Sequence, residues 1–190
     1  MKKNIFISVI IFFYFSIGNL YSQDINISEP DFMGEVLYVN PATGTGQLLE
    51  KSPVQLKSKL GASAYIVGIG SAKTRMTIKG CCSSVRIHQG GDLQFIIKAV
   101  DNKTDPLSII KLFRMESKKN ERRAEVASVS TFGGSSSNNL ELLPFVAKKY
   151  GESSYLITIS RVEQGEYGAI VLNPNALDEK ATIISCFGVD

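Results

Sequence analysis

Short apolar segments separated by turn residues recur along almost the whole chain, and this pattern limits the fold more than any other feature. In residues 75–79 (Arg-Met-Thr-Ile-Lys) apolar and polar side chains alternate strictly, which is the period of a strand with one buried face. Turn signals rich in Gly, Pro and Asn, such as 40–46 and 88–91, separate such segments at intervals of roughly 8–12 residues. The pattern predicts strands over 35–39, 64–69, 75–79, 93–100, 108–116, 123–131, 142–148, 154–160, 165–172 and 181–187.

This arrangement predicts an all-β fold. Strand spacing of this kind is typical of an antiparallel β-sandwich of the jelly-roll or Ig-like type with roughly ten strands, and a β-barrel is the alternative. The charged segment 117–122 between two strands predicts a hairpin. Residues 107–115 are the strongest competitor for a helix, but Pro106 and the short length leave that segment ambiguous.

The first 22 residues have the layout of a secretory signal peptide. Lys2 and Lys3 precede an apolar run from Ile5 to Ile17, and polar and small residues follow it. The run is too short to span a bilayer comfortably, so we predict cleavage between Ser22 and Gln23 rather than retention as a membrane anchor. The expected organisation is a signal peptide over 1–22 and a single domain over 23–190, without a membrane span after cleavage.

Cleavage would change the charge balance of the chain. It removes two of the 21 basic residues and none of the 18 acidic ones, so the net charge falls from +3 to +1. Nucleic-acid binding would require a clustered basic surface and more net charge, so we expect no nucleic-acid partner. Four basic residues do gather in one segment, but Glu116 and Glu121 are interleaved with them: Lys118, Lys119, Arg122 and Arg123. This segment predicts a solvated hairpin tip, with an anionic glycan as the lesser alternative.

Three cysteines in an exported chain suggest one disulfide and one remaining thiol, because the compartment is oxidising. Adjacent Cys81 and Cys82 are not expected to bond each other, since the peptide between them would be strained. If the alternation of 75–79 continues, Cys82 lies on the inward face. We therefore predict a Cys82–Cys186 disulfide, with Cys81 as the alternative partner of Cys186. Three reduced, buried thiols are a further alternative.

Catalytic and metal-binding motifs are sparse in this sequence. His88 is the sole histidine, it lies before a Gly-Gly-Asp turn, and no Gly-x-Ser-x-Gly motif accompanies it. The spacing Cys-Cys-x5-His lacks the Cys-x2-Cys knuckle of structural zinc sites. Residues 101–105 begin like a calcium loop but have Lys103 at the third position and lack the closing glutamate, so a turn is expected. We predict no metal, no cofactor and no catalytic residue.

A hydrolase that uses carboxylates or a loop-bound metal on a β-fold is the alternative function. Glu163, Glu166, Asp92 and Asp101 are available for such a site, but a sequence alone cannot place two of them at a catalytic distance. The chain has no Trp, which counts against a sugar-stacking platform.

The end of the leader and the segment Gln164–Gly168 resemble those of secreted bacterial proteins, and this resemblance implies no site residue. Together the observations favour an exported, monomeric binding or structural interaction module over an enzyme. We expect it to reside in the periplasm, on the outer surface or outside the cell, with a protein or glycan of the cell envelope as its partner. Loops at one end of the sandwich are the expected binding surface.

Overall fold

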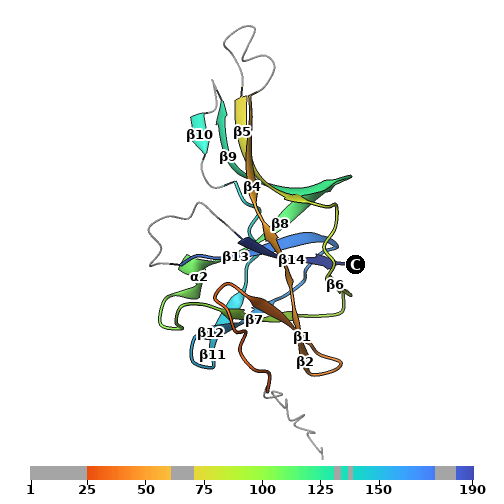
Figure 1. Ribbon diagram of the computed structural model, residues 1–190, viewed down its shortest axis with the longest axis vertical. Helices are drawn as coiled ribbons and strands as arrows, with labels where there is room; N and C mark the ends of the chain where they lie inside the picture. The colour runs from red at the N-terminus through yellow and green to blue at the C-terminus, as the bar shows by residue number, and fades with distance from the viewer. Residues whose placement is uncertain (1–24, 61–70, 131–133, 137–138, 174–182) are drawn as a thin grey trace, which may run out of the picture.

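The computed structural model describes residues 25–60, 71–130, 134–136, 139–173 and 183–190 (Figure 1). The predicted leader, its cleavage site and the strand predicted over 64–69 lie outside the described residues. Within the described ranges, no helix has the length and apolar character needed to cross a membrane.

The described residues form strands in two sheets, and the prediction of an all-β fold built from antiparallel sheets is confirmed. The five-stranded sheet has the order β11-β12-β7-β1-β2, and the nine-stranded sheet has the main order β3-β14-β13-β8-β9-β5-β4, with β6 beside β14 and β10 beside β9. The strands of the smaller sheet are β1 (Val36–Asn40), β2 (Thr45–Leu48), β7 (Leu93–Lys98), β11 (Val146–Tyr150) and β12 (Ser154–Ile159). Those of the larger sheet are β3 (Glu50–Pro53), β4 (Gln55–Leu60), β5 (Ser71–Lys79), β6 (Arg86–Ile87), β8 (Ile110–Lys118), β9 (Glu121–Ser130), β10 (Gly134–Ser136), β13 (Gly165–Val171) and β14 (Ile183–Val189). Only β6 pairs in parallel, with β14, among the pairings of the described strands.

The first core cluster fills the space between the two sheets, as in a sandwich. It combines apolar side chains of β1, β7 and β12 with those of β8, β13 and β14. Its centre is a row of aromatic rings: the ring centroids of Phe95 and Phe187 lie 4.9 Å apart, and those of Phe187 and Tyr167 lie 5.3 Å apart. Phe95 belongs to the smaller sheet and the other two rings to the larger one, so the row holds the sheets together.

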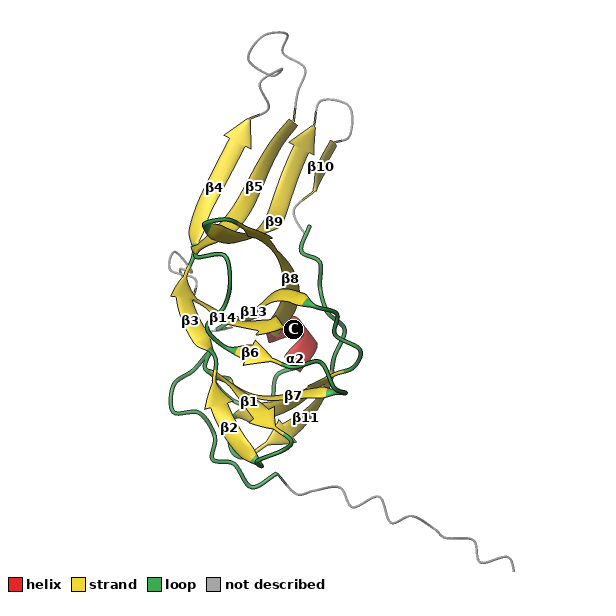
Figure 2. Ribbon diagram, turned by 90° about the vertical axis from the view of Figure 1, so that its right-hand side faces the viewer, coloured by secondary structure: helices red, strands yellow, loops and turns green. Residues whose placement is uncertain are grey.

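A second core cluster lies on the inner side of the larger sheet, which curls on itself (Figure 2). Met76 and Ile78 of β5 meet Phe113 of β8 and Ile184 of β14 there. Gly168 permits this curl, because a Cβ at that position would lie 2.9 Å from side-chain atoms of both Ile184 and Phe113.

Strands β4, β5, β9 and β10 extend beyond the rest of the molecule, and we call them the arm (Figures 1 and 2). The arm diverges at β8, which pairs with β9 only over residues 116–118. Closer to the start of β8, residues 141–143 take the place of β9: Arg114 N donates to Glu141 O at 2.9 Å, and Leu143 N donates to Leu112 O at 2.8 Å. We call residues 139–145, which lead from the arm to β11, the crossing segment.

The predicted hairpin at 117–122 is confirmed, since β8 ends at Lys118 and β9 begins at Glu121. The segment that was ambiguous between helix and strand contains both. Pro106–Ile109 forms one helical turn, α2, with the Asp105 side chain accepting from Leu107 N at its start, and β8 follows directly. Arg122 differs from its expected place on a solvated tip, because it is almost completely buried.

The cysteines differ from the predicted pairing. The structure joins the Sγ atoms of Cys81 and Cys82 and leaves Cys186 as a buried free thiol. The Cys82–Cys186 prediction assumed that the alternation of β5 continues through residue 82. Instead β5 ends at Lys79, and Gly80 turns the chain with a φ of 88°. Cys82 is therefore exposed, whereas Cys186 faces the second core cluster.

Thiol labelling should distinguish the two pairings. We expect no alkylation of the native, unreduced protein, because burial raises the pKa of the Cys186 thiol to about 12 and keeps it from solvent. In denaturant without reductant, one label should appear, and peptide mass mapping should place it on Cys186. A label on Cys81 would instead support the Cys82–Cys186 bond, and labels on all three cysteines would exclude both pairings.

Candidate functional site

A cluster of charged side chains lies beside the second core cluster. Arg122 of β9 is only 1% exposed, and its Nη2 donates to Glu50 Oε1 at 2.6 Å. Its Nη1 lies 3.9 Å from Glu166 Oε2 on β13, a carboxylate that is 5% exposed. Arg86 pairs with Glu166 and with Asp190, near the end of β14. We call these five residues the ionic cluster.

The ionic cluster fastens the segment after β5 to the larger sheet. Glu50 accepts hydrogen bonds from Ser84 N at 2.7 Å and from Ser83 Oγ at 3.1 Å, and Glu166 accepts from Ser83 N at 2.8 Å. Burial alone would raise the pKa of Glu50, but hydrogen bonds from Arg122, Ser84 N and Ser52 outweigh burial and lower this pKa to about 2. The carboxylates are thus engaged in holding the fold.

Acid should destabilise the protein through Glu50. Its pKa is lower in the folded chain than its ordinary value of 4.5, so the stabilisation is complete above pH 4.5 and is lost as pH falls towards 2. The size of the shift corresponds to about 3 kcal/mol of the free energy of unfolding. Urea unfolding at a series of pH values measures this loss.

The Glu50→Gln variant is the control for the acid series, because it has no carboxyl group to protonate at this position. Its free energy of unfolding should fall less steeply than that of the wild type between pH 4.5 and 2. Equal slopes for the two chains would contradict the assignment to Glu50.

The residues considered for catalysis from the sequence do not meet at one place. Glu166 is buried in the ionic cluster, and His88 and Asp92 are exposed. Asp101 accepts from Lys103 N at 2.8 Å and from Thr104 N at 3.3 Å, which confirms the predicted turn. No group of three or more His, Cys, Asp or Glu side chains that could hold a metal ion occurs in the part of the chain that the structure describes.

Two adjacent hollows lie on either side of the crossing segment, and we refer to them together as the groove. The first has a volume of about 230 Å³, and the second one of about 300 Å³. Leu142, Leu143 and Pro144 line both hollows. The second is mainly apolar and is completed by Leu107, Ile110, Lys111, Leu112 and Phe145.

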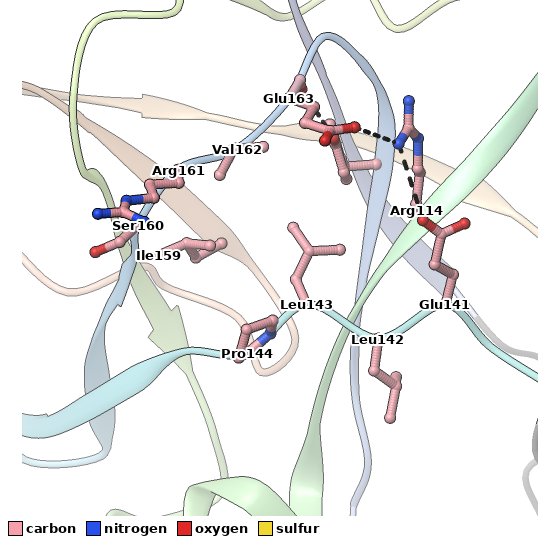
Figure 3. A pocket seen from close by; sticks show the side chains of 11 residues that line it. Arg114, Glu141, Leu142, Leu143, Pro144, Ile159, Ser160, Arg161, Val162 and Glu163 are labelled. Atoms are coloured by element: carbon pink, nitrogen blue, oxygen red, sulfur yellow. Dashed lines mark hydrogen bonds and ion pairs between the residues drawn. The ribbon is translucent and has the colours of Figure 1, made fainter.

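The first hollow combines apolar walls with charged rims (Figure 3). Leu143, Ile159 and Tyr167 supply apolar surface, and Figure 3 shows Arg161 and Arg114 on opposite sides of it. Arg114 is paired: its Nη1 lies 2.9 Å from Glu163 Oε2 and 3.8 Å from Glu141 Oε1. The hydrogen bond with Glu163 raises the pKa of Arg114.

Arg161 differs from Arg114 in two ways. It is exposed, and its side chain has no hydrogen bond or ion pair with any residue that the structure describes. Its backbone has a φ of 56°, and it is the only described residue other than glycine with a positive φ. The turn between β12 and β13 therefore holds an unpaired cation at the edge of an apolar hollow.

The groove brings together residues that the sequence analysis had largely overlooked. Glu163 was among the residues that the sequence analysis considered for a site, but Arg114, Glu141 and Arg161 were not. They come from β8, the crossing segment and the β12–β13 turn, and no motif spacing connects these three segments. Comparison with known proteins assigns no family to the chain: no protein-family model, no curated protein and no solved structure matches it significantly.

Proposed function

We propose that this protein is an exported binding module that recognises a partner protein through the groove along the crossing segment. Arg161 is the observation that carries the proposal. A residue other than glycine in the left-handed region costs of order 1–3 kcal/mol, and such strain persists mainly at functional sites. Here the strained residue places a free guanidinium beside an apolar hollow.

The size and chemistry of the first hollow indicate what would fill it. Its volume of about 230 Å³ is below the range of about 300–1,000 Å³ that is typical of small-molecule sites. It suits a single large side chain of a partner protein. Arg161 would then pair with a carboxylate next to that side chain. The expected ligand is an exposed chain segment in which an apolar residue stands beside Asp or Glu.

The hydrolase alternative rests on Glu141 and Glu163, which share one rim of the first hollow. Their side chains are 72% and 77% exposed, and both lie against the same Arg114 guanidinium. A carboxyl group that serves as a general acid is held protonated by an apolar, shielded environment. These two carboxylates have neither burial nor an apolar neighbourhood of that kind, so binding is the better supported function.

Substitution of Arg161 with glycine should separate stability from binding. Glycine adopts a positive φ without strain, so we expect the free energy of unfolding to stay the same or rise by up to about 1 kcal/mol. Affinity for peptides with an apolar–Asp pair should fall about tenfold or more, because a charge-assisted hydrogen bond is lost. A peptide array in which Asp is replaced by Asn or Lys, probed with labelled protein, measures both the preference and its loss.

The matched control for this test is Lys103→Gln, which also removes one exposed cation but lines neither hollow. It should bind the array as the wild type does. Equal retention of peptides bearing Asp and Lys by the wild type, or unchanged binding by Arg161→Gly, would contradict the proposed function. Turnover of a glycoside or ester substrate that is lost in Glu163→Gln would favour the hydrolase.

A further inference from the structure

The outward side of the arm, opposite the second core cluster, carries rows of cationic side chains. The register of β4, β5 and β9 sets Lys57 opposite Arg75, Arg75 opposite Glu125, and Lys79 opposite Glu121. The pairing of β8 with β9 adds Glu116 opposite Arg123 and Lys118 opposite Glu121. We call this surface the basic face: Lys57, Lys73, Arg75, Lys79, Lys118 and Arg123, with Glu116, Glu121 and Glu125 between them.

Carboxylates on the basic face are outnumbered by cations. Glu125 lies 2.8 Å from Lys73 and 3.7 Å from Arg75, and Glu116 pairs with Arg123 at 2.7 Å and also with Lys118. Six cations against three carboxylates leave three positive charges on the described side chains of this face. The lysines also remain open to solvent, since Lys57, Lys73 and Lys118 are 46%, 45% and 47% exposed.

The strand pairing that builds this face includes an unfavourable contact. Lys57 stands directly opposite Arg75 on neighbouring strands, and like charges in that position are destabilising. Lysines that serve only to keep an edge strand from pairing with another chain do not need to stand opposite another cation. Glu121, which lies 2.9 Å from Lys57, and Glu125, which lies 3.7 Å from Arg75, offset part of this repulsion. The excess of three cations over carboxylates on the face is left for a partner to balance.

We propose that the basic face binds an anionic polysaccharide that carries repeated carboxylate or sulfate groups. Lys73 and Arg75 stand about 6.6–7 Å apart along β5, and Lys57 stands about 4.8 Å from Arg75 on the neighbouring strand, so the charges are spaced closely enough for a polymer with repeated anionic groups. No aromatic side chain is present on this face among the described residues, which disfavours base stacking with single-stranded nucleic acid. The described positions of the face also offer no apolar side chain for insertion into a membrane surface.

Binding to dextran sulfate and to polygalacturonate, with neutral dextran as the blank, tests this proposal. We expect the wild type to bind at least one of the two anionic polymers and not the neutral one. Its affinity should fall about tenfold or more between about 50 and 200 mM salt, because bound counterions are released. The Lys57→Gln/Lys73→Gln/Lys79→Gln variant should bind at least about tenfold more weakly than the wild type.

The control for total charge is the Lys103→Gln/Lys148→Gln/Lys149→Gln variant, which removes three exposed lysines away from the arm. It should bind as the wild type does, and both variants should unfold at the wild-type temperature. Equal weakening in the two triple variants would overturn the proposal. So would the absence of binding to both polymers, or tighter binding to poly-thymidine oligonucleotide or to anionic lipid vesicles. Arg161→Gly should leave polymer binding unchanged, so failure here is distinct from failure of the proposed function.

Discussion

Replacement of Glu50 with glutamine is expected to lower the free energy of unfolding by about 3–5 kcal/mol. Glu50 is the carboxylate closest to Arg122, at 2.6 Å, and Arg122 is 1% exposed. The Nε and Nη1 atoms of Arg122 have no hydrogen-bond partner among the described residues, so Nη2 makes its principal contact. A neutral partner would leave a buried guanidinium charge poorly compensated, and that penalty is large. Chemical denaturation at neutral pH measures the loss.

Two further variants decide whether the buried charge is the cause. Glu141→Gln removes an exposed carboxylate that also lies near an arginine, and its effect should stay within about 0.5 kcal/mol. Arg122→Met in the Glu50→Gln background removes the uncompensated charge and should recover part of the lost stability. A loss for Glu50→Gln no larger than that for Glu141→Gln would contradict this account.

The strands that sequence reasoning identified are rich in apolar residues, which either alternate with polar ones, as in β5, or follow one another through the core, as in β13 and β14. Residues 75–79 belong to β5, where Met76 and Ile78 are buried and Lys79 is exposed. By contrast, β2 (Thr45–Leu48) and β3 (Glu50–Pro53) were missed, because exposure along β2 and the polar composition of β3 leave no apolar period to detect. They are strands because β2 pairs with β1 and β3 pairs with β14.

Arg122 shows why composition mispredicts particular charged residues. It stands in a run of basic and acidic residues that is typical of a solvated hairpin tip. Side chains of β9 alternate between the two faces of the sheet, so Arg122 points inward together with Ala124, whereas Arg123 points outward. Its partners, Glu50 and Glu166, are separated from it by 72 and 44 positions in the chain. Only the curl of the larger sheet brings these residues together.

The groove could not be predicted for a related reason. Its walls depend on the crossing segment replacing β9 beside β8, which is a consequence of where the arm diverges. The left-handed conformation of Arg161 carries no sequence signal either, because glycine, asparagine or aspartate would be the residues expected there. Sequence reasoning therefore reached the fold class, but not the residues of the candidate site.

Replacement of Phe95 with alanine should lower the free energy of unfolding by about 3–5 kcal/mol. Phe95 lies on β7, the central strand of the smaller sheet, and is 1% exposed. Its ring packs against Phe187 at 4.9 Å and against Tyr38 at 5.8 Å, so alanine would leave a cavity between the two sheets. In a chain of this length the loss corresponds to a fall in Tm of about 10 °C, which calorimetry or circular dichroism measures.

The size of the cavity, rather than the loss of apolar surface in general, should set this effect. Phe95→Leu keeps most of the side-chain volume and should cost less than about 1.5 kcal/mol. Leu56→Ala removes an apolar side chain that is 70% exposed on the arm and should stay within about 0.5 kcal/mol. A loss for Phe95→Ala below about 1.5 kcal/mol would mean that the sheets are held together elsewhere. The aromatic row of Phe95, Phe187 and Tyr167 would then not be the principal contact between them.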